Sequence, residues 1–372
     1  MIDKDCNAIV YCQGAFNTTN GKTAHGLVRF TERYRVVTVV DARFAGSDAG
    51  EVLDGVKKNI PITAGIREAI ETARNMGASA THLLMGLAPD GGRLPLSAKS
   101  DIQIAIQEGL HVDSGLHDYL CDDPALAGLA KEHSVRLRDI RKPRLVSELH
   151  FFNGKIEEVD AFKIVVLGTD SAVGKRTTAW RLVQGFEEVG FKAELIGTGQ
   201  TAWLQGARYS IILDSLVNDF VAGEIEHVVW SAWSESKPDI IVIEGQGSLM
   251  NPAYPGGFEI LAAGRPDVVV LQHAPARKEY DGFPGYKIHS LATQIQAIEL
   301  LSGKPVVAIA VNHEGIPLER VGRVCSAINS QTELPVSDVL LDGPKELVAA
   351  LLHWKRRRSA CRTTAAKNQH AC

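Results

Sequence analysis

The stretch KIVVLGTDSAVGKRTT, residues 163–178, decides the fold of the second half of this chain. Its apolar residues 164–167 predict a buried β-strand, followed by a loop bounded by glycines and a helix that begins near Gly174. This is the layout of a phosphate cradle, because loop N–H groups point inward, the helix N-terminus adds partial positive charge and Lys175 adds a full one. An ordinary strand–turn–helix corner is the alternative.

The spacing of the loop departs from the usual G-x4-G-K-[ST] pattern. Five residues separate Gly168 from Gly174, and Arg176 stands where a metal-binding hydroxyl normally follows the lysine. Thr177 and Thr178 are then the substitute hydroxyls. We predict that the whole loop binds the phosphates of a cofactor, through Gly168, Thr169, Asp170, Ser171, Ala172, Val173, Gly174, Lys175, Arg176, Thr177 and Thr178.

Two further apolar runs in this half end in residues that can carry chemistry. The run PDIIVIEGQG, residues 238–247, places Glu244 at the end of a strand, where a P-loop domain presents an acid toward Mg²⁺ and phosphates. Thr177 and Glu244 are therefore the predicted metal ligands. His273 follows the strand predicted over residues 265–271, at the carboxyl end of the sheet where ligands bind. Glu244 and His273 are both candidates for a general base.

The first half begins as a doubly wound α/β domain. An apolar strand at residues 7–12, Gly14, a helical segment, a strand at residues 36–40 and Asp41 follow one another. The G-x-G-x-x-G fingerprint is missing, so binding of a dinucleotide is only weakly indicated. Gly21-Lys22-Thr23 imitates the end of a P-loop, and we expect either a capped helix start or a substrate contact from Lys22.

Polar loops after strands supply the remaining candidates. Arg93, in the glycine- and proline-rich residues 88–95, can bind a carboxylate of the substrate, or be a plain surface arginine. His117 lies in a loop with another histidine and two aspartates and is a third candidate base, although loop histidines are usually solvated. Thr198, Gln200 and Thr201 follow a strand that ends near residue 196, so we predict contacts with the substrate.

The length of 372 residues fits two domains. We predict a Rossmann-like domain over residues 1–150, a P-loop domain over residues 151–354 and a disordered basic tail over residues 355–372. A net charge of −4 gives no reason to expect nucleic-acid binding, and no apolar run is long enough for a membrane span. The six cysteines show no metal-binding spacing. We expect a cytoplasmic homo-oligomer that acts on small molecules.

Two resemblances follow from these motifs. GTDSAVGKRTT with VIEGQGS resembles the phosphate loop and acid-glycine turn of dethiobiotin synthetase-like P-loop proteins. Over residues 7–350 the chain more closely resembles the D-glutamate N-acetyltransferase family, long catalogued as a domain of unknown function. The segments that carry this resemblance are Lys22-Thr23-Ala24, residues 88–95, Ser114-Gly115-Leu116-His117, residues 168–178, Thr198-Gly199-Gln200-Thr201, Asp219-Phe220, Gly223, residues 244–249 and Pro252-Ala253-Tyr254.

The resemblance implies a Rossmann-like N-terminal domain, a P-loop C-terminal domain and acetyl transfer from acetyl-CoA to the amine of an amino acid, D-glutamate. Three features depart from the family pattern: Arg176, the cysteine-bearing tail, and Asn251, a position at which histidine is expected in many relatives. Two other functions stay open at this point. One is an ATP- and Mg²⁺-dependent ligase or kinase acting on a small carboxylic or amino acid. The other is a regulator that binds a nucleotide without chemistry on a small molecule.

Overall fold

The computed structural model describes residues 6–369, without the side chains of Asp90 and of residues 361–369. The chain forms two compact units. Unit 1 comprises Met1–Leu145, Gly199–Ala207 and Ile212–Leu216, and unit 2 comprises Val146–Thr198, Arg208–Ile211 and Val217–Cys372. Each unit is an α/β structure built on one parallel sheet, which confirms the predicted fold class.

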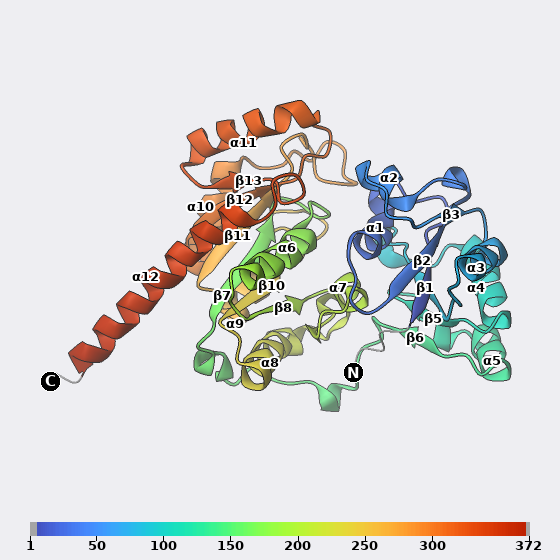
Figure 1. Cartoon of the computed structure of the whole chain (residues 1–372). Coiled ribbons are helices and arrows are strands. Elements are labelled where there is room, and N and C mark those ends of the chain that lie inside the picture. Colours follow the sequence, from blue (N-terminus) through green and yellow to red (C-terminus); the bar gives the residue numbers. More distant parts are fainter. Residues whose placement is uncertain (1–5, 370–372) are drawn as a thin grey trace. The chain divides into compact units, whose positions relative to one another are not determined.

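Unit 1 has a six-stranded sheet of order β3-β2-β1-β4-β5-β6. Its strands are β1 (Asn7–Tyr11), β2 (Arg35–Val40), β3 (Ile62–Thr63), β4 (His82–Met85), β5 (His111–Ser114) and β6 (Leu137–Asp139). Its helices are α1 (Lys22–Arg29), α2 (Ala49–Asp54), α3 (Ile66–Asn75), α4 (Leu96–Gln107), α5 (Pro124–Glu132) and α7 (Gln200–Gln205). Helices α3, α4 and α5 pack side by side on one face of the sheet, and α1 covers the other (Figure 1).

The strand order of unit 1 reverses between β1 and β4. The chain runs outward from β1 through β2 to β3, and then returns to β4 on the other side of β1. Loops that leave two neighbouring strands in opposite directions at such a point leave room for a ligand at the carboxyl ends of the strands. The loops after β1, β4 and β5 carry Lys22, Arg93 and His117, so these predicted site residues lie on the ligand side of the sheet.

Unit 2 has a seven-stranded sheet of order β13-β12-β11-β7-β10-β8-β9. Its strands are β7 (Phe162–Gly168), β8 (Ala193–Gly197), β9 (Tyr209–Ser210), β10 (Ile240–Glu244), β11 (Val268–His273), β12 (Val306–Val311) and β13 (Val336–Ser337). Its helices are α6 (Lys175–Glu188), α8 (Asn218–Ser236), α9 (Phe258–Gly264), α10 (Leu291–Ser302), α11 (Leu318–Thr332) and α12 (Lys345–Gln369). Helices α6 and α12 pack together, as do α8, α9 and α10.

The central strand of unit 2 is β7, and all of its residues are buried, as the apolar run predicts. It pairs with β10 on one side and with β11 on the other, with Glu244 opposite Val166 and Gln272 opposite Gly168. The carboxyl ends of these three strands therefore meet at one edge of the sheet. This register brings the phosphate loop, Glu244 and His273 to the same end of unit 2.

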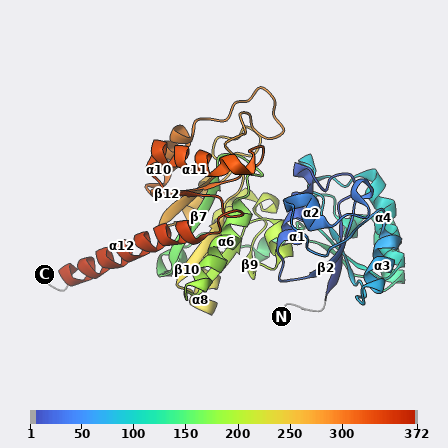
Figure 2. The ribbon, with the colours of Figure 1, turned by 45° about the horizontal axis from the view of Figure 1, so that its top comes forward.

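Two features of the chain differ from the sequence prediction. The predicted second domain was continuous, but Gly199–Ala207 and Ile212–Leu216 cluster with unit 1. The tail was predicted to be disordered from residue 355, but α12 continues as a helix to Gln369, and Figure 2 shows it extending beyond the sheet of unit 2. Among the described residues, no helix combines the length and apolar character needed to cross a membrane.

Candidate functional site

The loop between β7 and α6 has the backbone of an anion cradle. Gly174 adopts a φ of 104° directly before α6, a conformation that suits a residue without a Cβ, and Ala172 has a φ of 50°. Within residues 6–369, the backbone N–H groups of Ala172, Gly174 and Thr177 have no hydrogen-bond acceptor. Since α6 has 14 residues, its N-terminus also contributes the positive end of a helix dipole.

Lys175 is the first residue of α6, and its side chain folds back over the loop. Only 8% of the residue is exposed. Its Nζ donates to the carbonyl oxygen of Asp170 at 2.9 Å and to that of Gly247 at 2.7 Å. The ammonium group is thus held at the mouth of the cradle by two neutral oxygens.

Asp170 holds the loop in shape. The residue is fully buried, and its Oδ1 accepts hydrogen bonds from the Ser171 N–H at 2.7 Å and the Asn251 amide at 2.8 Å. Its Oδ2 accepts from Arg277 Nη1 at 3.1 Å and from the Asp281 N–H at 2.9 Å. The prediction gave Asp170 a contact with the cofactor. Since both carboxylate oxygens bond to protein groups, its side chain acts on the loop itself.

The outward-facing carbonyl groups of the loop are also fixed. Arg277 donates to the carbonyl oxygens of Ser171 at 2.9 Å and Ala172 at 3.3 Å, and to the carboxylate of Glu314 at 2.8 Å. The Asn312 amide donates to the carbonyl oxygen of Val173 at 3.0 Å. Because the carbonyls point away from the cradle and are bonded, the N–H groups of the loop point the other way.

The three threonines of the loop have different surroundings. Thr178 donates its hydroxyl hydrogen to the side-chain oxygen of Gln272 on β11. Thr169 and His273 share a hydrogen bond of 3.0 Å between Oγ1 and Nδ1. Thr177 is half-buried and makes no side-chain hydrogen bond within the described residues. Of the two predicted substitute hydroxyls, Thr177 is therefore the one left for a ligand or a metal ion.

Glu244, at the end of β10, is 6% exposed. Its Oε2 accepts a hydrogen bond of 3.1 Å from the backbone N–H of Thr198, whose hydroxyl donates to the Glu244 carbonyl oxygen at 3.0 Å. Burial raises the pKa of Glu244, and the positive charges of Arg176 and Lys175 and the Thr198 N–H only partly oppose the rise. A carboxylate with a raised pKa is a stronger base than an exposed one.

His273 is less suited to take up a proton. Burial, with a smaller effect from the charge of Lys278, lowers the pKa of His273 to about 4. The ring is therefore neutral near pH 7, and its hydrogen bond with Thr169 connects it to the phosphate loop. A base with so low a pKa has little driving force for removing a proton from an amine.

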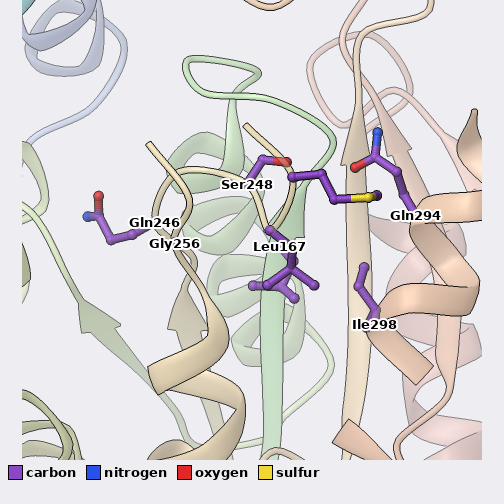
Figure 3. Close-up of a pocket in the computed structure, with 9 residues that line it drawn as sticks. Leu167, Gln246, Ser248, Gly256, Gln294 and Ile298 are labelled. Carbon is purple, nitrogen blue, oxygen red and sulfur yellow. The ribbon is translucent and has the colours of Figure 1, made fainter. Parts of the chain in front are cut away.

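A narrow cavity lies beside the start of the phosphate loop, lined by apolar side chains and by Gln246, Ser248 and Gln294 (Figure 3). In Figure 3, Leu167 on β7 lies beneath Ser248, and Gln294 and Ile298 lie across from them on α10. The Ser248 hydroxyl is buried and has no hydrogen-bond partner within the described residues. Ser248 directly follows Gly247, whose carbonyl accepts from Lys175, so the cavity adjoins the cradle.

A second group of predicted residues gathers in unit 1. Thr201, at the start of α7, shares a hydrogen bond of 2.8 Å with the buried hydroxyl of Thr23. A Cβ at Gly115 would stand only 2.5 Å from Cγ of Gln200, so a larger residue in the loop after β5 would force the Gln200 side chain to move. Lys22 is exposed at the start of α1. These residues come from three separate stretches of the chain.

His117 belongs to the same unit and is bonded to an arginine that the sequence did not indicate. Nη1 of Arg141 donates to Nε2 of His117 at 2.5 Å and to Oδ2 of Asp214 at 2.6 Å. Burial and the charge of Arg141 lower the pKa of His117, against smaller opposite effects of Asp214 and Asp118. Since the guanidinium occupies the Nε2 lone pair, His117 cannot accept a proton there while this bond persists.

Arg93 takes a different position. Its side chain is 77% exposed and pairs with Asp118, whose Oδ1 lies 2.8 Å from the Arg93 Nε.

The structure therefore sorts the predicted site residues into two sets. Unit 2 holds the phosphate loop, Thr198, Glu244 and His273, and unit 1 holds Lys22, Arg93, His117, Gln200 and Thr201.

Sequence reasoning missed Arg141, Gln272 and Arg277. Each acts through contacts with residues far away in the chain, and the only local signal was that each lies at or shortly after the carboxyl end of a strand. Within the described part of the chain, no three His, Cys, Asp or Glu side chains form a group that could hold a metal ion. The predicted metal ligands Thr177 and Glu244 include a hydroxyl, which lies outside that class, and they stay a prediction.

Comparison with known proteins identifies the family. Residues 150–348 match the P-loop domain, and residues 42–143 the Rossmann-like domain, of a family described as a domain of unknown function, DUF1611. The chain belongs to the DUF1611 family. A solved DUF1611 family protein from Anabaena variabilis has a TM-score of 0.85 and 27% identity to this DUF1611 protein, and covers 94% of this chain and 99% of its own.

Two curated relatives carry a functional name. A protein from Pseudoalteromonas sp is 30% identical over 298 residues, which are 78% of this chain and 86% of the relative. A protein from Tritonibacter scottomollicae is 30% identical over 308 residues, 80% of this chain and 88% of the relative. Both are named D-glutamate N-acetyltransferase. The resemblance noted from the sequence motifs is thereby confirmed, and at this distance the relatives support an acetyltransferase activity in general terms.

Proposed function

We propose that this DUF1611 protein is an N-acetyltransferase that transfers the acetyl group of acetyl-CoA to the amine of an amino acid, with D-glutamate as the acceptor. The observation that carries the proposal is the match to two relatives of that name over 78% and 80% of this chain and 86% and 88% of the relatives. The geometry of the phosphate loop supports it independently.

The cradle of unit 2 fits the donor. Acetyl-CoA carries a pyrophosphate and a 3′-phosphate, and it supplies the activated acetyl group as a thioester. The free N–H groups of Ala172, Gly174 and Thr177, the helix N-terminus and the ammonium of Lys175 are the groups that bind phosphate in proteins. The hydroxyl of Thr177 and the carboxylate of Glu244 are oxygen ligands of the kind that Mg²⁺ prefers, should the phosphates carry that ion.

Among the three candidate bases, Glu244 fits the reaction best. The acceptor amine must give up a proton as its nitrogen forms a bond to the acetyl carbon; the carbon–sulfur bond then breaks, and the CoA sulfur takes up a proton and leaves as the thiol. Burial gives Glu244 a raised pKa, whereas His273 has a pKa of about 4 and His117 receives a hydrogen bond from Arg141. We assign the removal of the proton to Glu244.

The test is an assay of thiol release with purified protein. Acetyl-CoA is incubated with D-glutamate, with other D- and L-amino acids, or with no acceptor, and the N-acetyl product is identified by mass spectrometry. We expect thiol release that depends on D-glutamate and forms one N-acetyl product per thiol. ATP turnover with Mg²⁺ and D-glutamate, without any need for CoA, would refute the proposal in favour of an ATP-dependent ligase or kinase. A chelator arm shows whether a metal ion is needed.

A further inference from the structure

Arg141 is a buried arginine at the ligand side of unit 1. It follows β6, and the backbone on both sides is fixed, since Ile140 donates to the Ser114 carbonyl and Lys142 to that of Asp139. Only 10% of the side chain is exposed. Its position next to the loop after β5 places the guanidinium beside His117, at the end of the sheet where ligands of such folds bind.

The hydrogen bonds of this guanidinium are all on one side. Nη1 donates to both His117 and Asp214. Within the described residues, Nε is buried and has no acceptor, and Nη2 donates no hydrogen bond. A buried donor without an acceptor is uncommon and calls for an explanation. Nε and Nη2 form the edge of a guanidinium that can donate two parallel hydrogen bonds, one to each oxygen of a carboxylate.

The charges around Arg141 favour an anion at that edge. Asp214 contacts only Nη1, and its side chain is 45% exposed, so solvent screens its charge. His117 has a lowered pKa and is neutral near pH 7, so it adds no negative charge. Asp118 is occupied by Arg93 and by the backbone N–H of Leu94. Among the residues that the structure describes, no carboxylate accepts a hydrogen bond from the Nε and Nη2 edge.

We propose that Arg141 binds a carboxylate group of the acceptor amino acid through its Nε and Nη2 edge, with Thr201, Gln200 and His117 around the same site. This inference rests on the proposed acetyltransferase function and names its acceptor site. It moves the carboxylate contact from Arg93, one of the two roles that the sequence left open for that residue, to Arg141, because Arg93 is exposed and already paired. A dicarboxylic amino acid has two carboxylates, and either of them can bind to the Nε and Nη2 edge.

The test compares Arg141→Gln and Arg141→Lys with Arg93→Gln, and uses Arg67→Gln as the control. Arg67 lies on α3 in an ion pair with Glu108, 67% exposed. Loss of hydrogen bonds between charged groups should raise the KM for D-glutamate about 10- to 150-fold in Arg141→Gln. The kcat should change by less than about 3-fold, because the contact is present before and during the reaction. Arg141→Lys should bind D-glutamate more tightly than Arg141→Gln but more weakly than the wild type, since lysine keeps the positive charge and lacks the pair of parallel N–H donors.

Two results would overturn the proposal. One is a folded Arg141→Gln protein with an unchanged KM for D-glutamate, and the other is a rise in KM in Arg93→Gln alone. Circular dichroism shows whether Arg141→Gln folds. If it does not fold, the KM of Arg141→Lys for D-glutamate decides the test. Calorimetric titration of D-glutamate into the wild type and the variants needs no turnover. If no acceptor is acetylated, but D-glutamate binds to the wild type and binds more weakly to the Arg141 variants, the proposed function fails and the proposed carboxylate site stands.

Discussion

Replacement of Lys175 by methionine tests the cradle directly. Methionine keeps most of the buried stem and removes the charge and the hydrogen bonds of 2.9 and 2.7 Å to the carbonyls of Asp170 and Gly247. Lys175 begins α6 and only 8% of the residue is exposed, so the attraction of its ammonium for a phosphate is only weakly screened by salt. A charge-assisted hydrogen bond contributes about 1.5–3 kcal/mol, so we expect the Kd for CoA to rise about 10- to 150-fold.

The assay is calorimetric titration of CoA at fixed salt, paired with a donor that lacks the phosphates. Acetyl-pantetheine carries the same thioester without the nucleotide, so its KM should be the same in Lys175→Met and the wild type. Lys287→Met, at an exposed position, is the matched control. The reasoning is refuted if folded Lys175→Met binds CoA as tightly as the wild type does, or if both donors lose affinity equally.

Two more predictions concern the groups behind the loop. Asp170→Ala breaks a buried ion pair with Arg277, which should lower the free energy of unfolding of the protein by about 3–5 kcal/mol. For a unit of this size the melting temperature should fall by about 6–20 °C in a circular dichroism experiment, and an unchanged value would contradict the role of Asp170. Because the pKa of His273 falls from 6.5 to about 4 on folding, the unfolded chain takes up a proton first as the pH drops. Stability should therefore decline by up to about 3 kcal/mol between pH 6.5 and 4 in urea titrations of the wild type, and His273→Gln should lack this decline.

Local patterns were enough to predict the cradle. The apolar run before Gly168 is a central strand, α6 begins at Lys175, and Glu244 and His273 end the strands on either side of β7. These features follow from residues close together in sequence, because strand hydrophobicity, glycine and helix starts are local properties. In parallel sheets, strands that end in polar residues bring those residues to one edge, so the grouping itself could also be predicted.

The residues that hold the site in place could not be predicted in this way. Arg141 lies in the charged run DIRKP, which has the composition of a linker, and its partner Asp214 is 73 residues further along the chain. Arg277 lies 107 residues from Asp170, whose place in the phosphate loop suggested a ligand contact. A sequence shows that an arginine is present, but burial and the choice of partner depend on contacts made only in the folded chain.

The segment after β8 shows why the boundary between the two units is not a point in the sequence. Thr198 bonds to Glu244 within unit 2, while Leu204, in α7, is fully buried in the core of unit 1. Gln205 donates to the carbonyls of Gly26 at 2.9 Å and Phe30 at 2.8 Å, and the Arg33 guanidinium lies 3.9 Å from the ring centre of Trp203. A chain cut at residue 150 would lose this core leucine together with the rest of α7. Truncation of a buried leucine to alanine alone lowers the free energy of unfolding by about 2–5 kcal/mol. The Rossmann-like half is therefore complete only in the full chain.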